Sequence, residues 1–177
     1  MREPSTGRTT APAQPFRAGR FALAFAGILV ALFAAELTRP IQHALVAPWT
    51  DLVARASAAM LRAFDRDVVA SDATIFSAST GFGITIRAGC NGVEAMLVLA
   101  AAMLAYPAPW RHRLLGLLAG TAAVQLLNFA RIASLFYLGR WSATAFEWAH
   151  LYVWQALIML DVLVVWLLWL GTIRPAR

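Results

Sequence analysis

The chain has 177 residues, of which 60% are hydrophobic, and its mean hydropathy is +0.65. Soluble domains are roughly 45–50% apolar, so this composition excludes a soluble globular protein and predicts a single membrane-embedded domain. The formal net charge is +6 and all 15 basic residues are arginines, but they flank apolar segments instead of forming a patch with interleaved aromatic residues. We therefore expect no nucleic-acid partner, and we interpret the arginines as determinants of membrane topology.

The apolar segments predict an all-α polytopic fold with about four transmembrane helices. Crossing the hydrocarbon core takes about 20 apolar residues. In chain order the expected spans are 21–37, 93–106, 114–138 and 151–170. They belong to one membrane-embedded domain at 21–172, between a disordered cytoplasmic tail at 1–20 and a cytoplasmic tail at 173–177. The second span is short for a membrane helix.

An insertion at about 38–89 separates the first two spans and is expected on the outer side of the membrane. Apolar residues recur there at helical spacing, which predicts an amphipathic helix lying on the membrane surface: Leu45, Trp49, Leu52, Val53, Ala56, Met60 and Phe64. Further on, 74–77 and 84–87 flank a Ser79-Thr80-Gly81 turn. This pattern predicts a small β-hairpin whose second strand leads to Cys90.

The arginines orient the chain. If both termini are cytoplasmic, that side holds eight arginines against one glutamate, whereas the outer side holds six arginines against six carboxylates. Cytoplasmic loops are enriched in arginine and lysine. We therefore expect a multi-pass protein of the plasma (inner) membrane, with both termini in the cytoplasm.

Cys90 is the only cysteine in the sequence and precedes the second span at its outer end. Asn91 followed three residues later by Glu94 predicts an N-cap and capping box at the start of that span. The positive end of the helix dipole would then favour a thiolate at Cys90, while the nearby Glu94 would oppose it.

Arg131 and His150 are predicted at a similar membrane depth to Cys90. Arg131 lies 17 residues into the third span, roughly 26 Å from its cytoplasmic end, and His150 opens the fourth span from the outer side. Polar residues also recur along one face of the third span, which indicates a bundle interior or a water-filled cleft: Thr121, Gln125, Asn128, Arg131 and Ser134.

These three residue types suit acyl transfer on a peptide. A thiolate attacks acyl carbons, a histidine transfers protons near neutral pH, and an arginine stabilises an oxyanion or holds a carboxyl group. Each also has an ordinary structural explanation: Cys90 as a small buried residue, His150 as an interfacial anchor, and Arg131 as a partner for Glu94 or Asp161. Their convergence at one depth favours the catalytic interpretation.

Three segments resemble the exosortase/archaeosortase family: Ala-Gly-Cys90-Asn-Gly-Val-Glu-Ala-Met, Leu-Leu-Asn128-Phe-Ala-Arg131-Ile-Ala-Ser-Leu-Phe-Tyr, and Glu-Trp-Ala-His150-Leu-Tyr-Val-Trp-Gln. The resemblance covers about 20–172, and the compact form is most similar to the short members called exosortase H. Many relatives carry serine after the cysteine, where this chain has Asn91.

The resemblance implies a membrane cysteine transpeptidase or protease whose active site faces the periplasm or cell exterior. Cys90, Arg131 and His150 would be its catalytic residues. It would act, beside membrane lipid, on C-terminal sorting tails with a short motif, a transmembrane helix and a basic cluster, and pass them to a surface acceptor. The substrate-binding candidates are Asn91, Glu94, Asn128, Trp148, Tyr152 and Trp154.

Two alternatives remain open. A thiol redox membrane protein would use Cys90 in a mixed disulfide, although the usual C-x-x-C pair is missing from the sequence. A non-enzymatic membrane subunit or small transporter would use Cys90 only for packing, and no inverted repeat supports a transporter. We expect no cofactor and no metal, because His43 and His112 lie in loops on opposite sides of the membrane.

Overall fold

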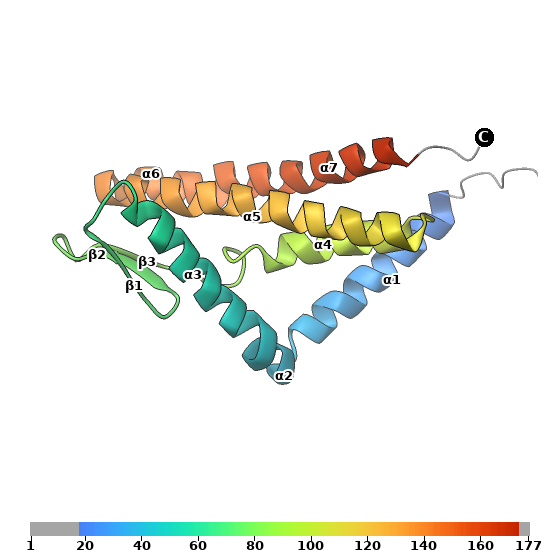
Figure 1. The fold of residues 1–177 in the computed structure, drawn as a ribbon, viewed down its shortest axis with the longest axis horizontal. Helices are drawn as coiled ribbons and strands as arrows, with labels where there is room; N and C mark the ends of the chain where they lie inside the picture. Colours follow the sequence, from blue (N-terminus) through green and yellow to red (C-terminus); the bar gives the residue numbers. More distant parts are fainter. Residues whose placement is uncertain (1–17, 174–177) are drawn as a thin grey trace, which may run out of the picture.

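A computed structural model of the chain describes residues 18–173, and its core is a bundle of long apolar helices (Figure 1). The elements follow in chain order: α1 (Ala18–Glu36), α2 (Arg39–Ile41), the π-helical turn η1 (Gln42–Val46), α3 (Ala47–Arg62), β1 (Val68–Ser71), β2 (Thr74–Ser77), β3 (Gly83–Thr85), α4 (Val93–Ala105), α5 (Trp110–Trp141), α6 (Ala143–Trp148), the π-helical turn η2 (Ala149–Val153) and α7 (Trp154–Thr172).

The predicted tails at 1–20 and 173–177 fall largely outside the described residues. Residues 18–20 already belong to α1, so the first helix begins three residues earlier than the apolar run predicts. The helix extends beyond that run because Ala18 and Arg20 have high helix propensity, and the single Gly19 between them costs only about 1 kcal/mol.

Among the described residues, three helical segments are long and apolar enough to cross a membrane: Ala18–Glu36, Trp110–Trp141 and Ala143–Thr172. The predicted second span is α4, which has 13 residues and a length of about 20 Å, short of the roughly 30 Å hydrocarbon core. The prediction of four full spans is therefore not confirmed. The chain is a multi-pass membrane protein in which α4 contributes a shorter apolar helix to the bundle.

The bundle core lies where α4 packs against α5 and α7. Its buried side chains come from all three helices: Ala95, Leu99, Met103, Val124, Ile158, Val162 and Trp169. Gly116 permits this packing, since a Cβ there would lie 2.3 Å from the Trp169 indole nitrogen. That nitrogen donates a hydrogen bond to the His112 carbonyl oxygen at 3.0 Å. The aromatic ring thereby fastens the end of α7 to the start of α5.

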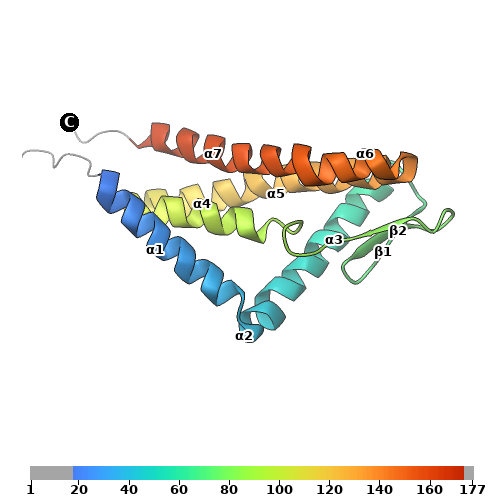
Figure 2. The same cartoon turned by 180° about the vertical axis from the view of Figure 1, so that it is seen from behind.

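Figures 1 and 2 show how the elements divide the molecule lengthwise. α5 and the continuous α6–η2–α7 segment run side by side along its whole length. α4 accompanies them over one half only, whereas α3 and the three strands lie beside the other half. The loop between β3 and α4, which contains Cys90, therefore lies near the middle of the molecule.

The strands form one antiparallel sheet in the order β1-β2-β3. The predicted hairpin is present as β2 and β3, but the sequence analysis missed β1, and β3 ends at Thr85 instead of continuing to residue 87. β1 was overlooked because Val68–Ser71 carries only a short alternation after a charged stretch. Asp67 holds the β2–β3 turn by accepting hydrogen bonds from the Ser77 hydroxyl and from the Ser79 hydroxyl and amide.

Helix α3 confirms the predicted helix but has two apolar faces instead of one. One face packs against the sheet and α5 and includes the fully buried Val53 and Ala54. The other face exposes Leu52 and Met60, by 51% and 44%, and Leu45 of the preceding turn η1 is 61% exposed. Helical periodicity alone does not tell which apolar residues face protein and which face lipid. The exposed stripe retains the character expected of a helix at a membrane surface.

Candidate active site

The Cys90 loop is held by two glycines and two side chains. Gly89 and Gly92 have φ angles of +82° and +80°, which glycine adopts without strain. The Asn91 side-chain oxygen accepts the Val93 amide at 3.0 Å, and the Glu94 carboxylate accepts the Gly89 amide at 2.6 Å. The predicted capping box is therefore wrong: the N-cap is Gly92, and Glu94 reaches back to Gly89 rather than to Asn91. The left-handed turn at Gly92 redirects the chain, so the Glu94 carboxylate does not reach the Asn91 amide as a capping box requires.

Gly92→Ala is expected to destabilise the protein more than Gly89→Ala. Both substitutions place a side chain at positive φ, which costs about 1 kcal/mol. Only at Gly92 would the new Cβ clash with a neighbour, at 2.4 Å from the Gln125 side-chain nitrogen, whereas nothing lies within 4 Å at Gly89. Overpacking adds about 1–3 kcal/mol. Thermal unfolding of the two purified variants measures the difference, and equal midpoints would contradict the close packing of Gly92 on α5.

Arg131, on α5, reaches the loop with both ends of its guanidinium fork. Nη1 donates to the Gly89 carbonyl oxygen at 2.9 Å and Nη2 donates to Cys90 Sγ at 3.5 Å. The side chain is 3% exposed. Gln125 and Asn128 on the same helix face are also buried, and Gln125 donates to the Asn91 carbonyl oxygen at 3.2 Å. The polar stripe predicted on this span therefore faces the loop that presents Cys90.

His150, on η2, also lies close to Cys90. Its Nδ1 lies 4.0 Å from Cys90 Sγ, and its ring stacks on Phe146 with centroids 5.5 Å apart and an interplanar angle of 8°. His150 does not open a helix, as the sequence predicted, because the helical segment begins at Ala143 and passes through η2. Single-turn π-helical segments occur frequently at functional sites, since they rotate a side chain relative to the regular helix.

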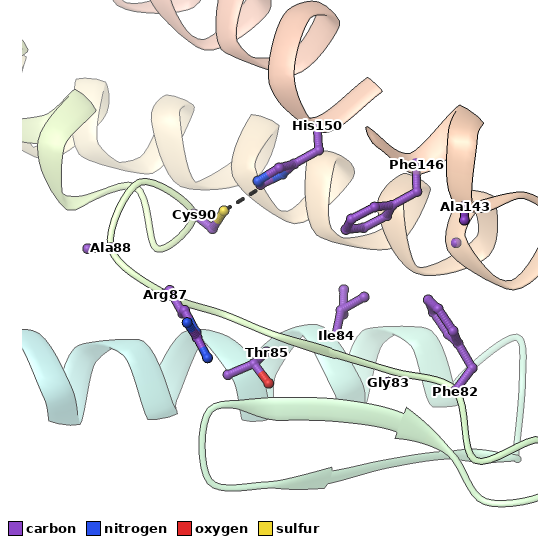
Figure 3. Close-up of a pocket in the computed structure, with 11 residues that line it drawn as sticks. Phe82, Gly83, Ile84, Thr85, Arg87, Ala88, Cys90, Ala143, Phe146 and His150 are labelled. Carbon is purple, nitrogen blue, oxygen red and sulfur yellow. Dashed lines mark hydrogen bonds between the residues drawn. The ribbon is translucent and has the colours of Figure 1, made fainter. Parts of the chain in front are cut away.

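A cavity of about 430 Å³ opens beside Cys90 and His150 (Figure 3). One wall consists of residues 82–85, Arg87 and Ala88, and the other comes from α5, α6 and η2, with Gly139, Ala143, Phe146 and His150. In Figure 3 the thiol and the imidazole lie together at one end, while Phe82 lies toward the other. The cavity thus has a thiol and an imidazole at one end of a mostly apolar slot.

Burial raises the pKa of the Cys90 thiol above its ordinary value, because desolvation disfavours the thiolate. The Arg131 guanidinium acts in the opposite direction, and the Glu94 carboxylate adds to the increase. The helix dipole, which is expected to lower the pKa of Cys90, does not outweigh the effect of burial. At neutral pH the resting form is therefore the thiol, which needs a base to become a nucleophile.

The rate of Cys90 alkylation by iodoacetamide is expected to rise about tenfold per pH unit from pH 7 to 9, without a plateau, since only the thiolate reacts. Glu94→Gln should increase the rate at a fixed pH by removing a nearby negative charge, and Arg131→Gln should decrease it. Intact-protein mass spectrometry measures adduct formation over time. A plateau near pH 7 would show a lowered pKa and contradict the effect of burial.

The structure places the six predicted substrate-binding residues outside the lining of this cavity. Asn91 and Asn128 are almost completely buried, and the Asn91 side chain donates to Thr50 Oγ1 at 3.0 Å. Glu94 holds the loop. Trp148 and Tyr152 are 62% and 60% exposed and contact each other, with centroids 4.9 Å apart. Trp154 is half-buried on α7. Their contact with a substrate stays a prediction.

The sequence analysis missed the residues that do line the slot, above all Phe82 and Phe146. Phe146 is four residues before His150, so helical spacing indicated that the two rings share a face. Phe82 is adjacent to the predicted turn and packs on α5, where Gly139 leaves room: a Cβ there would lie 2.3 Å from the Phe82 ring. Only the fold brings Gly139 and Phe82 together. Within residues 18–173, no three His, Cys, Asp or Glu side chains are grouped to hold a metal ion.

Comparison with known proteins identifies the chain by its family. The family described as transmembrane exosortase (Exosortase_EpsH) matches residues 9–171. No curated protein and no solved structure matches the chain. The match spans most of the sequence and confirms the family predicted from the three motifs. Its members are membrane transpeptidases or proteases that act on proteins bearing sorting signals. The chain therefore belongs to the transmembrane exosortase family.

Proposed function

We propose that this protein is a cysteine transpeptidase that cleaves the C-terminal sorting tails of secreted proteins and transfers them through a thioester to a surface acceptor. The observation that carries the proposal is the contact of Cys90 Sγ with both Arg131 Nη2, at 3.5 Å, and His150 Nδ1, at 4.0 Å. A thiol, an imidazole and a fixed cation thus lie together, and the thiol and the imidazole line one end of a peptide-sized cavity.

The active site is proposed to face the periplasm or cell exterior, with both termini in the cytoplasm. The arginine distribution supports this orientation. α5 has 32 residues and is about 48 Å long, so one end extends beyond a hydrocarbon core of about 30 Å. If the short α4 lies in the membrane, the end of α5 that extends beyond the hydrocarbon core is the end that contacts the sheet. Cys90 then lies near the outer boundary of the bilayer.

The substrate is a tail with a short motif, one transmembrane helix and a basic cluster. The transmembrane helix of the tail enters the lipid beside the bundle. Its basic end stays in the cytoplasm, because basic residues next to a membrane helix favour the cytoplasmic side. The motif then reaches the cavity at the depth of Cys90. The exposed aromatic pair Trp148 and Tyr152 has the amphipathic character of residues at a membrane interface, and we retain it as a candidate contact for the tail.

In the first step His150 accepts the thiol proton and Cys90 Sγ attacks the scissile carbonyl carbon, giving a tetrahedral oxyanion. Arg131, fixed by its bond to the Gly89 carbonyl, supplies positive charge beside the attacking sulfur and the developing oxyanion. Collapse of the intermediate breaks the C–N bond, and His150 returns the proton to the leaving amine. An acceptor amine or water then attacks the thioester and regenerates the thiol.

A covalent intermediate tests this proposal. A tagged secreted protein ending in a sorting tail from the same cell is incubated with the purified enzyme, without an acceptor. We expect an adduct on Cys90 whose mass equals the N-terminal substrate fragment and which hydroxylamine removes. Cleavage of the tail with no adduct, or cleavage by the Cys90→Ala variant, would refute a thioester at this residue.

A thiol redox role finds no support in the geometry of the site. Mixed-disulfide chemistry requires an accessible thiol but neither a buried arginine nor a histidine against the sulfur. The dependence of activity on Arg131 separates the two functions: a redox protein would keep its thiol exchange in an Arg131 variant that still folds, whereas a transpeptidase would lose tail processing.

A further inference from the structure

We infer that the enzyme binds its peptide substrate as an added strand on the free edge of β3. This inference rests on the proposed function and extends it, because it assigns the backbone groups that align the substrate with Cys90. The strand order β1-β2-β3 leaves β3 paired on one side only. Its other side belongs to the cavity that ends at Cys90 and His150.

The lining of the cavity shows that it follows the edge of the strand. Successive side chains of a β-strand point to opposite faces of the sheet. Phe82, Gly83, Ile84 and Thr85 all line the same cavity, although they follow one another in sequence. A cavity on one face of the sheet would contact alternate residues only. In Figure 3 this segment lies between the other strands of the sheet and α6, and it leads directly to Cys90.

The hydrogen-bond pattern identifies which backbone groups are open to a substrate. Phe82 O accepts from Ser77 N and Ile86 N donates to Ala73 O, each at 2.8 Å. The intervening pair is Ile84 with Ile75. Backbone groups alternate in direction along a strand. Gly83 and Thr85 therefore direct their N–H and C=O groups away from β2 and toward the cavity, and among the described residues they have no hydrogen-bond partner.

The occupant is an extended peptide, and its direction follows from the proposed substrate. The tail approaches from outside, with its transmembrane helix on the C-terminal side of the cleaved bond. β3 runs from the far end of the cavity toward Cys90 and the bundle, so the residues before the cleaved bond lie parallel to it. The segment from 82 to 87 is about 17 Å long, enough for four or five substrate residues. Main-chain pairing supplies affinity, while the flanking Phe82 and Phe146 rings contact alternate side chains.

Reactive peptides of different length test this mode without knowledge of the recognition motif. The probes are acetyl-alanyl and acetyl-tetraalanyl chloromethyl ketones, applied to the purified full chain at pH 9, with iodoacetamide as the reference reagent. We expect the longer probe to label Cys90 about tenfold faster than the shorter one, since it adds backbone hydrogen bonds to Gly83 and Thr85. In further probes, the backbone amide nitrogen of one alanine at a time is methylated. We expect the faster labelling of the longer probe to be lost when alternate alanines are methylated, and to be kept for the alanines between them.

A pair of variants tests the same point from the protein side. Thr85→Pro removes the outward N–H group without removing a bond to β2, and edge strands tolerate proline. Thr85→Val is the matched control, since both variants lose the 3.0 Å hydroxyl contact with Thr74. We expect Thr85→Pro to be labelled at the same rate by the long and the short probe, whereas Thr85→Val should still be labelled faster by the long probe. The rate with iodoacetamide should stay the same in both, which shows that the site is intact.

The outcomes separate this inference from the proposed function. If both chloromethyl ketones labelled Cys90 at the same rate, or if methylation lowered the labelling rate equally at every probe residue, strand addition would be overturned. The thioester chemistry would not be affected by either result. A Cys90 that reacts with no probe and forms no acyl adduct would overturn both. A length effect with a two-residue period in methylation supports the added strand.

Discussion

Cys90→Ala is expected to reduce tail processing to background, at least about 10³-fold below the wild-type rate, because no other thiol exists in the chain to form the thioester. Cys90→Ser should be nearly as inactive. A hydroxyl is far less acidic than a thiol, and the histidine nitrogen is already 4.0 Å from the sulfur, beyond normal hydrogen-bond distance for an oxygen. Cleavage of a tagged tail, followed by gel electrophoresis in reconstituted membranes, measures the loss.

The folding control for Cys90→Ala is direct. Cys90 is only partly buried, so its removal should leave the unfolding midpoint within a few degrees of the wild type. The variant should still bind a tail without cutting it, and the complex should be recoverable through the tag. A folded Cys90→Ala protein that processes tails at the normal rate would show that another group carries the chemistry.

The long helices and the neighbourhood of Cys90, Arg131 and His150 could be anticipated from the sequence, for a physical reason. A bilayer imposes a length and an apolar composition on each span, so the depth of a residue follows from counting along the helix. Counting along the helices predicts Arg131 and His150 at the level of Cys90, and in the structure both side chains contact the Cys90 sulfur. Membrane depth constrained these positions more tightly than soluble sequence patterns usually do.

The local features that depend on tertiary contacts were predicted poorly. The capping box at Asn91 and Glu94 was wrong because Gly92 adopts a left-handed turn against Gln125, a contact between segments 33 residues apart that no local pattern reveals. β1 was missed because a four-residue strand gains its stability from pairing with β2.

The residues that line the cavity also could not be predicted from local sequence patterns, because tertiary contacts bring them together. Phe82 and Gly139 meet only in the folded chain, and the free edge of β3 follows from the strand order, which the predicted hairpin lacked. Asn91 and Asn128 are predicted substrate contacts that stay untested, and in the structure their side chains donate hydrogen bonds to Thr50 and Gln125. A motif identifies residues that a site needs and does not tell which of them touch the substrate.

Arg131→Lys is expected to lower the turnover rate by about 10²–10³-fold while preserving the positive charge. The guanidinium contacts the Gly89 carbonyl and the Cys90 sulfur at once, through two different nitrogens. A lysine has one ammonium group and cannot hold the same fork geometry. The loop would lose its anchor or the sulfur would lose its donor, and either loss weakens stabilisation of the transition state. Steady-state kinetics on a tagged tail separate this effect on kcat from any change in KM.

Arg140→Lys is the matched control, since Arg140 also lies on α5 but does not line the cavity and instead forms a surface ion pair with Asp65 at 2.7 Å. Exposed pairs contribute about 0–1 kcal/mol, so this variant should keep near-normal turnover and stability. If both lysine variants were equally active, the positive charge alone would suffice at position 131. The two-pronged contact would then be structural, and the transition state would draw its stabilisation from another donor. If only Arg131→Lys fails, with an unfolding midpoint close to that of Arg140→Lys, the geometry of the guanidinium is what the reaction requires.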